Sequence, residues 1–122
     1  MPLAVLLADD HDFVRRSIKS LLESDPEIRV VAEAVNFREA MQKAAELKPD
    51  VVVLDLHMGD ENQFEPAEVK AAFAGVRLMA VSIWDDEETK FLAQSYGAAA
   101  TVDKTNLARV LIPVVKSQGP AE

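Results

Sequence analysis

Three aspartates, a serine and a lysine are the residues whose types and positions suggest chemistry. Asp9, Asp10, Asp55, Ser82 and Lys104 each end or follow a short apolar run. Carboxylates placed close together repel one another unless a cation compensates, and Mg²⁺ prefers a few carboxylates together with waters and phosphate oxygens. An aspartate can also attack phosphorus and form an acyl phosphate, which a cation and an ammonium group would assist. The set therefore suggests phosphorylation of an aspartate.

The aspartate best placed for this role is Asp55. It ends the apolar run 51–54, which is rich in β-branched residues and lies between Pro49 and the polar segment 59–63. Such a run is typical of a strand buried on both faces at the centre of a parallel sheet. Because the carboxyl ends of strands line the ligand crevice of open α/β sheets, we expect Asp55 at the mouth of a crevice.

Four further segments are predicted to be strands, and they would bring the other candidates to the same edge. They cover residues 3–8, 28–34, 76–82 and 98–102. Five strands that alternate with five helices predict right-handed βαβ units, and hence an α/β fold with a parallel sheet and helices on both faces. The residues at the strand ends should then converge, although they are scattered along the sequence.

Each predicted helix has a start or a stop signal. The expected N-caps or first residues are Asp12, Asn36, Pro66, Asp85 and Thr105. The expected stops are Asp25, Pro49, Phe73 and Gly97. Pro113 is expected to kink or shorten the last helix.

Length, charge and cysteine content limit the function classes. A chain of 122 residues is long enough for one core and too short for two domains. The formal charge of −8 argues against nucleic-acid contact by this segment. The absence of cysteine excludes disulfides and thiolate metal sites and fits a cytoplasmic protein. No apolar run has membrane-spanning length, and no secretory signal is evident.

The residues at the strand ends resemble the receiver domain of two-component response regulators. The resemblance covers Leu3 to about Lys116, and it depends on five motifs at matched spacing rather than on any one of them. The segment Asp9–His11 together with Val14 and Arg15, and the segment 31–34, look most like receivers that are coupled to a helix-turn-helix output domain. The resemblance implies a flavodoxin-like, doubly wound five-stranded sheet of order 2-1-3-4-5 with five helices.

The resemblance also implies a role for each candidate residue. Asp55 would be the phosphoacceptor, Ser82 the switch hydroxyl and Lys104 the phosphate partner. The ligands of a Mg²⁺ ion would be Asp9, Asp10, Asp55 and the backbone carbonyl of His57.

The implied partners are a histidine kinase, or a phosphotransfer protein, and a second copy of the chain in a homodimer. A DNA-binding output domain could lie outside the segment, and the sequence fits a free-standing receiver equally well. Residues 3–116 would form the core of a single receiver domain, and 117–122 a tail or the start of a linker.

The chain departs from the usual family pattern at three positions. Gly59 and Thr105 stand where proline is common, and Thr101 stands where an aromatic switch residue is common. We expect a looser or a differently shaped loop around His57 and Met58, and an altered coupling between the hydroxyl and the aromatic position. A phosphorylation-independent receiver that acts as an interaction module therefore stays open as an alternative.

Taken alone, each candidate has a simpler structural interpretation. Asp9 and Asp10 could cap the first helix, Ser82 could be a turn residue, and Lys104 could be a solvated surface residue. Chance convergence of all of them with Asp55 is much rarer than any single coincidence.

The two histidines and the tryptophan lead to three further expectations. His11 and His57 lack a zinc-type ligand set, so we favour structural roles for both side chains. His57 and Trp84 are bulky and could hinder an attacking water, which would slow the loss of phosphate from Asp55. Phosphatases and mutases that use an aspartate nucleophile typically have a second aspartate two residues later. This chain has His57 there, so we expect no sustained turnover and do not expect an enzyme.

Overall fold

The computed structural model describes residues 2–83 and 86–117, except for the side chain of Ala108. The described residues form five strands: β1 (Leu3–Ala8), β2 (Ile28–Ala34), β3 (Val51–Asp55), β4 (Arg77–Ser82) and β5 (Ala100–Asp103). The helices are α1 (Asp12–Glu23), α2 (Phe37–Leu47), α3 (Pro66–Ala72), α4 (Glu87–Ser95) and α5 (Leu107–Ser117). Two short 3₁₀ helices, η1 (Glu61–Gln63) and η2 (Lys104–Asn106), follow β3 and β5. The expected alternation of strand and helix is confirmed.

All neighbouring strands are parallel, in the order β2-β1-β3-β4-β5. The doubly wound order implied by the resemblance is therefore confirmed. Along the carboxyl edge, Ala8 is paired with Leu54, and Ser82 with Asp103. This register brings the residues that follow β1 and β5 to the same edge as the end of β3.

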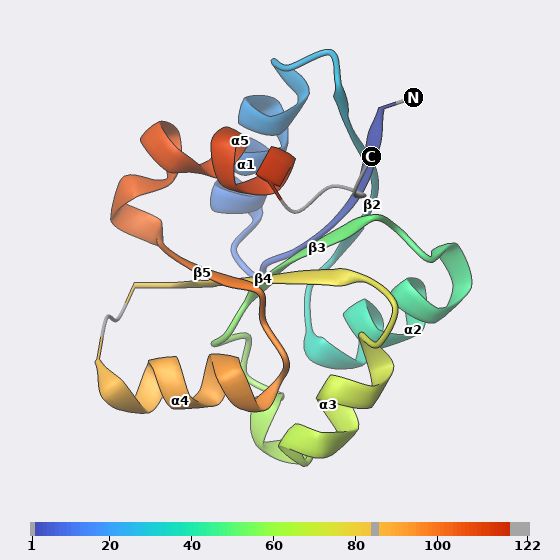
Figure 1. The fold of residues 1–122 in the computed structure, drawn as a ribbon, viewed down its shortest axis with the longest axis vertical. Coiled ribbons are helices and arrows are strands. Elements are labelled where there is room, and N and C mark those ends of the chain that lie inside the picture. Colours follow the sequence, from blue (N-terminus) through green and yellow to red (C-terminus); the bar gives the residue numbers. More distant parts are fainter. Residues whose placement is uncertain (1, 84–85, 118–122) are drawn as a thin grey trace.

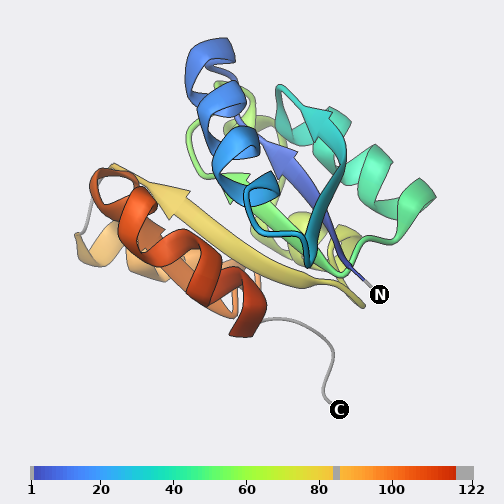
Figure 2. The ribbon, with the colours of Figure 1, turned by 90° about the horizontal axis from the view of Figure 1, so that it is seen from above.

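Helices cover both faces of the sheet. Figure 1 shows α1 and α5 on one face and α2, α3 and α4 on the other, and Figure 2 shows the same arrangement from above. Side chains alternate between the faces along each strand, so Leu6 packs in the core under α2–α4 and Val5 in the core under α1 and α5. The five residues of β3 are at most 4% exposed, which explains their continuous apolar run.

Several helix boundaries differ from the prediction. Asp12 is the first residue of α1 and His11 is its N-cap, so the predicted cap was wrong. The N-cap of α4 is Asp86, whose side chain accepts from the Thr89 amide at 2.8 Å, while the predicted cap Asp85 lies outside the described residues. Thr105 lies within η2, which is capped by Asp103.

The strands β4 and β5 begin later than predicted, at Arg77 and Ala100. The last helix is not shortened by Pro113, because α5 continues through it to Ser117. Residues 118–122, the greater part of the predicted tail, lie outside the described residues. No helix among the described residues combines the length and the apolar composition that a membrane span requires.

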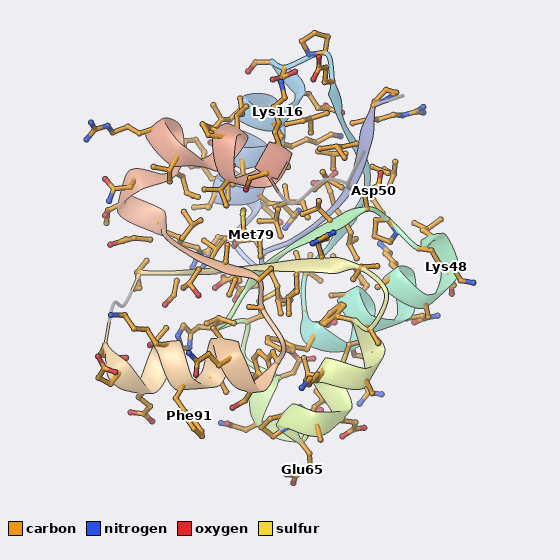
Figure 3. The ribbon with its side chains drawn as sticks, viewed as in Figure 1. Lys48, Asp50, Glu65, Met79, Phe91 and Lys116 are labelled. Carbon is orange, nitrogen blue, oxygen red and sulfur yellow. The ribbon has the colours of Figure 1, made fainter. Side chains whose placement is uncertain are left out.

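The entry to β3 is fixed at the end of the sheet opposite the candidate site. Lys48 adopts a left-handed conformation with φ +46° and ends α2. Asp50 then accepts a hydrogen bond from the Ala4 amide at 2.8 Å, which ties the start of β3 to β1 (Figure 3). The start of the strand that carries Asp55 is thus anchored to the neighbouring strand β1.

Candidate functional site

The ends of the parallel strands bring the predicted residues together. Lys104, just after β5, places its Nζ 3.0 Å from Asp55 Oδ2 and 3.0 Å from Asp9 Oδ2. Ser82 is the last residue of β4 and is 1% exposed. The expected convergence at one edge of the sheet is therefore observed, with one ammonium group bridging two carboxylates.

Asp9 is almost fully buried, and its polar atoms are bonded to the protein. Its Oδ1 accepts from the His11 amide at 2.9 Å, and its Oδ2 faces Lys104. Its backbone N–H donates to the carbonyl of Ala34 at 3.0 Å, and its backbone carbonyl accepts from Arg15 Nη1 at 2.9 Å. The carboxylate therefore has a fixed position between β1 and Lys104.

Asp55 combines burial with few compensating contacts. It is 4% exposed, its Oδ1 accepts from the His57 amide at 3.1 Å, and its Oδ2 accepts from Lys104 Nζ. Burial raises the pKa of Asp55, although the His57 N–H and the Lys104 charge act in the opposite direction. The charged form of this carboxylate is thus under-stabilised, and a cation beside it would relieve that cost.

In Lys104 the same environment favours the charged form of the side chain. Burial alone would lower its pKa, but its hydrogen bonds and charge interactions with Asp9 and Asp55 outweigh burial and leave the pKa above the ordinary lysine value. The ammonium therefore stays charged at neutral pH. One positive charge shared between two buried carboxylates still leaves a local negative excess.

The acidic residues are close enough to hold one metal ion. Asp9, Asp10, His11 and Asp55 each offer one ligand atom, and these atoms lie within 4.8 Å of one another. Three of the four are carboxylate oxygens, the donors that Mg²⁺ prefers, so the residues fit this cation. From the sequence we favoured a structural role for His11, but its Nδ1 lies 3.0 Å from Asp10 Oδ1. Its position next to the acidic pair was the available signal.

Comparison with known proteins gives the family. The profile of the response regulator receiver domain matches residues 5–116. The chain belongs to this family.

Two relatives of this receiver domain are VraR response regulators. The protein of Staphylococcus saprophyticus is 32% identical over 117 residues, which cover 95% of this chain and 56% of the relative. The protein of Staphylococcus aureus is 30% identical over 123 residues, covering 100% of this chain and 59% of the relative. The chain thus spans a little over half the length of these relatives.

Solved structures of receiver domains are similar in fold. The signal receiver domain of the response regulator NarL from Mycobacterium tuberculosis has a TM-score of 0.84 at 25% identity, covering 95% of this chain and 94% of its own. The response regulator domain of Thermotoga maritima CheB has a TM-score of 0.83 at 26% identity, covering 97% and 96%.

A small pocket gives access to Asp55 in this receiver domain. It has a volume of about 100 Å³ and is lined by His11, Asp55, His57, Ile83 and Lys104. Ile83 is 57% exposed, and no sequence signal distinguished it from a loop residue. Trp84, which we expected beside the phosphoryl group, lies outside the described residues.

The loop after β3 has its own set of contacts where this receiver domain departs from the family pattern. Gly59 has φ +99°, a conformation that side-chain-bearing residues rarely adopt. Glu61 Oε1 accepts from the amides of Met58 at 3.2 Å and Gly59 at 2.7 Å. The carboxylate of Asp60 bonds the first turn of α2. The loop is therefore held by carboxylate hydrogen bonds on both sides of Gly59 and is not loose at this point.

Proposed function

We propose that this receiver domain is a signalling switch that accepts a phosphoryl group on Asp55 in a Mg²⁺-dependent reaction. The observation that carries the proposal is the bridge from Lys104 Nζ to Asp55 and Asp9, both at 3.0 Å, at the end of a fully buried strand. A buried carboxylate with a fixed ammonium beside it meets the two needs of phosphoryl transfer, which are positioning and positive charge.

Each residue of the site would have its own role in the phosphoryl transfer. A carboxylate oxygen of Asp55 forms a bond to phosphorus while the bond from phosphorus to the donor breaks, and the donor leaves with that electron pair. Asp9, Asp10, Asp55 and the carbonyl of His57 would hold Mg²⁺, which neutralises charge on the phosphoryl oxygens when bound. Lys104 would contact a second oxygen of the phosphoryl group.

Ser82 would contribute the third contact, with its hydroxyl donating to the remaining phosphoryl oxygen. It is the last residue of β4 and is buried, so a movement of its side chain would be transmitted to the segment that follows. Phosphorylation would then bias a two-state rearrangement of the face formed by α4, β5 and α5.

The partners follow from the same proposal. The donor would be a histidine kinase, a phosphotransfer protein or a small phosphodonor, and the site would act in the cytoplasm. Because the curated relatives are longer than this chain, we propose that residues 3–116 form one receiver module of a protein with a DNA-binding output domain and that residues 117–122 lead toward it. Phosphorylated copies would pair as homodimers. The net charge of −8 leaves nucleic-acid contact to the output domain.

Intact-mass spectrometry after incubation with acetyl phosphate and Mg²⁺ tests the proposal. The wild type should gain one phosphoryl group, Asp55→Asn should gain none, and chelation of Mg²⁺ should abolish the gain. Asp50→Asn is the matched control, because Asp50 precedes the same strand and lies at its opposite end. Modification of Asp55→Asn to the wild-type level would overturn the assignment.

The alternative, a receiver that does not use phosphate, has one observation in its favour. Thr101 is exposed on β5 at the position where an aromatic switch residue is common. Beryllofluoride with Mg²⁺ separates the two functions. A phosphate-dependent switch should show a change in tryptophan fluorescence that is absent in Asp55→Asn. Identical spectra with and without beryllofluoride would favour the interaction module.

A further inference from the structure

We propose that Arg15 is a positioning residue of the cation site, because its guanidinium group fixes the peptide from which Asp10 projects. The inference rests on the proposed function, since it assigns a role toward the Mg²⁺ ion of that same site. Arg15 lies one turn into α1, and its side chain is 13% exposed. It was part of the family resemblance, but nothing in the sequence gave it a role.

The three donor positions of the Arg15 guanidinium contact three different segments. Nη1 donates to the backbone carbonyl of Asp9 at 2.9 Å, directly after β1. Nε donates to Glu33 Oε1 at 3.1 Å on β2, and Nη2 donates to Asp12 Oδ1 at 2.7 Å at the start of α1. The planar fork of arginine allows these bonds to form together, and a lysine has no equivalent geometry. Figure 2 shows α1 lying over β1 and β2, which brings the three segments within reach of one side chain.

The carbonyl of Asp9 belongs to the planar peptide that also contains the Asp10 amide. Holding this carbonyl therefore sets the direction in which the chain leaves β1 and in which Asp10 projects. The Asp9 side chain has other anchors, namely the His11 amide and Lys104. The Asp10 side chain is 35% exposed, and its Oδ1 lies 3.0 Å from His11 Nδ1. Of the two acids, Asp10 thus depends more on the backbone for its placement.

Charge alone predicts the opposite effect of Arg15. A positive group near the acidic pair would repel a divalent cation, so its removal should strengthen Mg²⁺ binding. Asp12 and Glu33 already neutralise Arg15, and Lys19 Nζ lies 3.5 Å from Glu33 Oε2. A positioning role predicts weaker Mg²⁺ binding when the guanidinium is lost. The sign of the change in Mg²⁺ affinity therefore distinguishes a positioning role of Arg15 from a purely electrostatic one.

The test is the Mg²⁺ affinity of the unphosphorylated chain, measured by titration calorimetry on matched pairs of variants. Arg15→Lys and Arg16→Lys both keep the charge, and Arg15→Ala and Arg16→Ala both remove it. Arg16 is the exposed neighbour on the same helix, so it controls for helix position and net charge. We expect Arg15→Ala to bind Mg²⁺ about tenfold more weakly, as is typical for groups that orient metal ligands. Arg15→Lys should lose at least about threefold, and both Arg16 variants should stay within about twofold.

A second readout follows the peptide itself in the absence of metal. The ¹⁵N amide resonance of Asp10 should shift in Arg15→Lys and stay in place in Arg16→Lys, because only the first variant loses the bond to the Asp9 carbonyl. If Arg15→Ala does not fold, the lysine pair decides the question.

Two results would overturn the positioning role while leaving the proposed function intact. One is equal Mg²⁺ affinity in the Arg15 and Arg16 variants, or tighter binding in Arg15→Ala. The other is a weakened affinity in Arg15→Lys with an unchanged Asp10 resonance. A wild type that binds no Mg²⁺ would instead overturn the Mg²⁺-dependent function and this inference with it.

Discussion

At the scale of single residues, the site holds more buried negative charge than positive charge. Asp9 and Asp55 are 1% and 4% exposed, and both carboxylates share the ammonium of Lys104. A shared ammonium leaves a negative excess, and a divalent cation with a phosphoryl group can complete the balance. Because of this imbalance, replacing Asp55 or Lys104 should change the stability of the metal-free protein, and the two changes should have opposite signs.

Replacing Asp55 by Asn should stabilise the metal-free protein. The raised pKa of Asp55 means that its ionised form costs folding free energy, so Asp55→Asn should gain about 1 kcal/mol at neutral pH. In the wild type, the folded state binds more protons than the unfolded chain between the ordinary carboxyl pKa and the raised value. Wild-type stability therefore falls as pH rises through that window, and the gain in the variant should vanish below it. Urea denaturation across this range measures both quantities.

The matched control for this experiment is Asp50→Asn, which keeps an acceptor for the Ala4 amide and lies away from Lys104. We expect no comparable gain there. A lower stability of Asp55→Asn than of the wild type at neutral pH would show that the Lys104 contact outweighs the cost of burial.

Replacing Lys104 by Met should have the opposite effect. Loss of the ammonium leaves two buried carboxylates uncompensated, and the free energy of unfolding should fall by about 2 kcal/mol, less than for a fully buried pair because Lys104 is 14% exposed. The raised pKa of Lys104 means that its contribution is complete below the ordinary lysine pKa and is lost as pH rises through the raised value.

Lys90→Met is the control for Lys104→Met, because Lys90 is 51% exposed and lies 4.0 Å from Glu87. Its effect should be below about 0.5 kcal/mol. Similar losses in the two variants, measured by urea denaturation at neutral pH, would contradict a special role of the Lys104 bridge.

At the scale of elements, the strand ends were predictable and the loop contacts were not. The apolar runs that end in Asp55 and Ser82 identified two strand ends from composition alone. The position of Asn36 also predicted the cap of α2, and its Oδ1 accepts from the Glu39 amide at 2.8 Å. Strand starts at Arg77 and Ala100 were misplaced, because apolar residues before a strand satisfy the same pattern as the strand itself.

The start of α2 shows a contact that sequence patterns cannot reveal. Asp60 Oδ1 accepts from the Phe37 amide at 2.8 Å, and Asp60 Oδ2 accepts from the Arg38 amide at 3.1 Å. The side chain of Asn36 accepts from the Glu39 amide, and the backbone carbonyl of Asn36 accepts from the Ala40 amide. The first four N–H groups of the helix therefore all have acceptors. Because Asp60 is separated from α2 by a whole strand, only the fold brings it there.

We therefore expect Asp60→Ala to destabilise the protein by about 1 kcal/mol, the usual effect of losing a helix cap. Asp60→Asn keeps one acceptor oxygen and should lose less. Urea denaturation compares the three proteins. An Asp60→Ala variant as stable as the wild type would show that water replaces this carboxylate at the helix start.

At the scale of the whole molecule, alternation of strands and helices predicted an α/β sheet with both faces covered. It did not predict which strands are neighbours; the order 2-1-3-4-5 came from the family resemblance, because periodicity carries no information on pairing. Contacts between segments far apart in the chain could not be predicted from the sequence either. Lys116 at the end of α5 lies 3.1 Å from Asp25 and 3.0 Å from Glu27 in the turn before β2 (Figure 3).

The convergence of the site residues belongs to this same scale. Asp9, Asp55 and Lys104 are far apart in the sequence, and the parallel pairing of the strands brings the strand ends that carry them to one edge. The type of each residue suggested phosphoryl chemistry, but the fold determines that one ammonium reaches both carboxylates.

The most direct test maps the modified residue. After treatment with acetyl phosphate and Mg²⁺, reduction with sodium borohydride converts an aspartyl phosphate to homoserine, which peptide mass spectrometry locates. We predict homoserine at position 55 in the wild type, dependent on Mg²⁺. Homoserine at another aspartate, or none under conditions in which the protein binds Mg²⁺, would contradict the assignment of Asp55 as the phosphoacceptor.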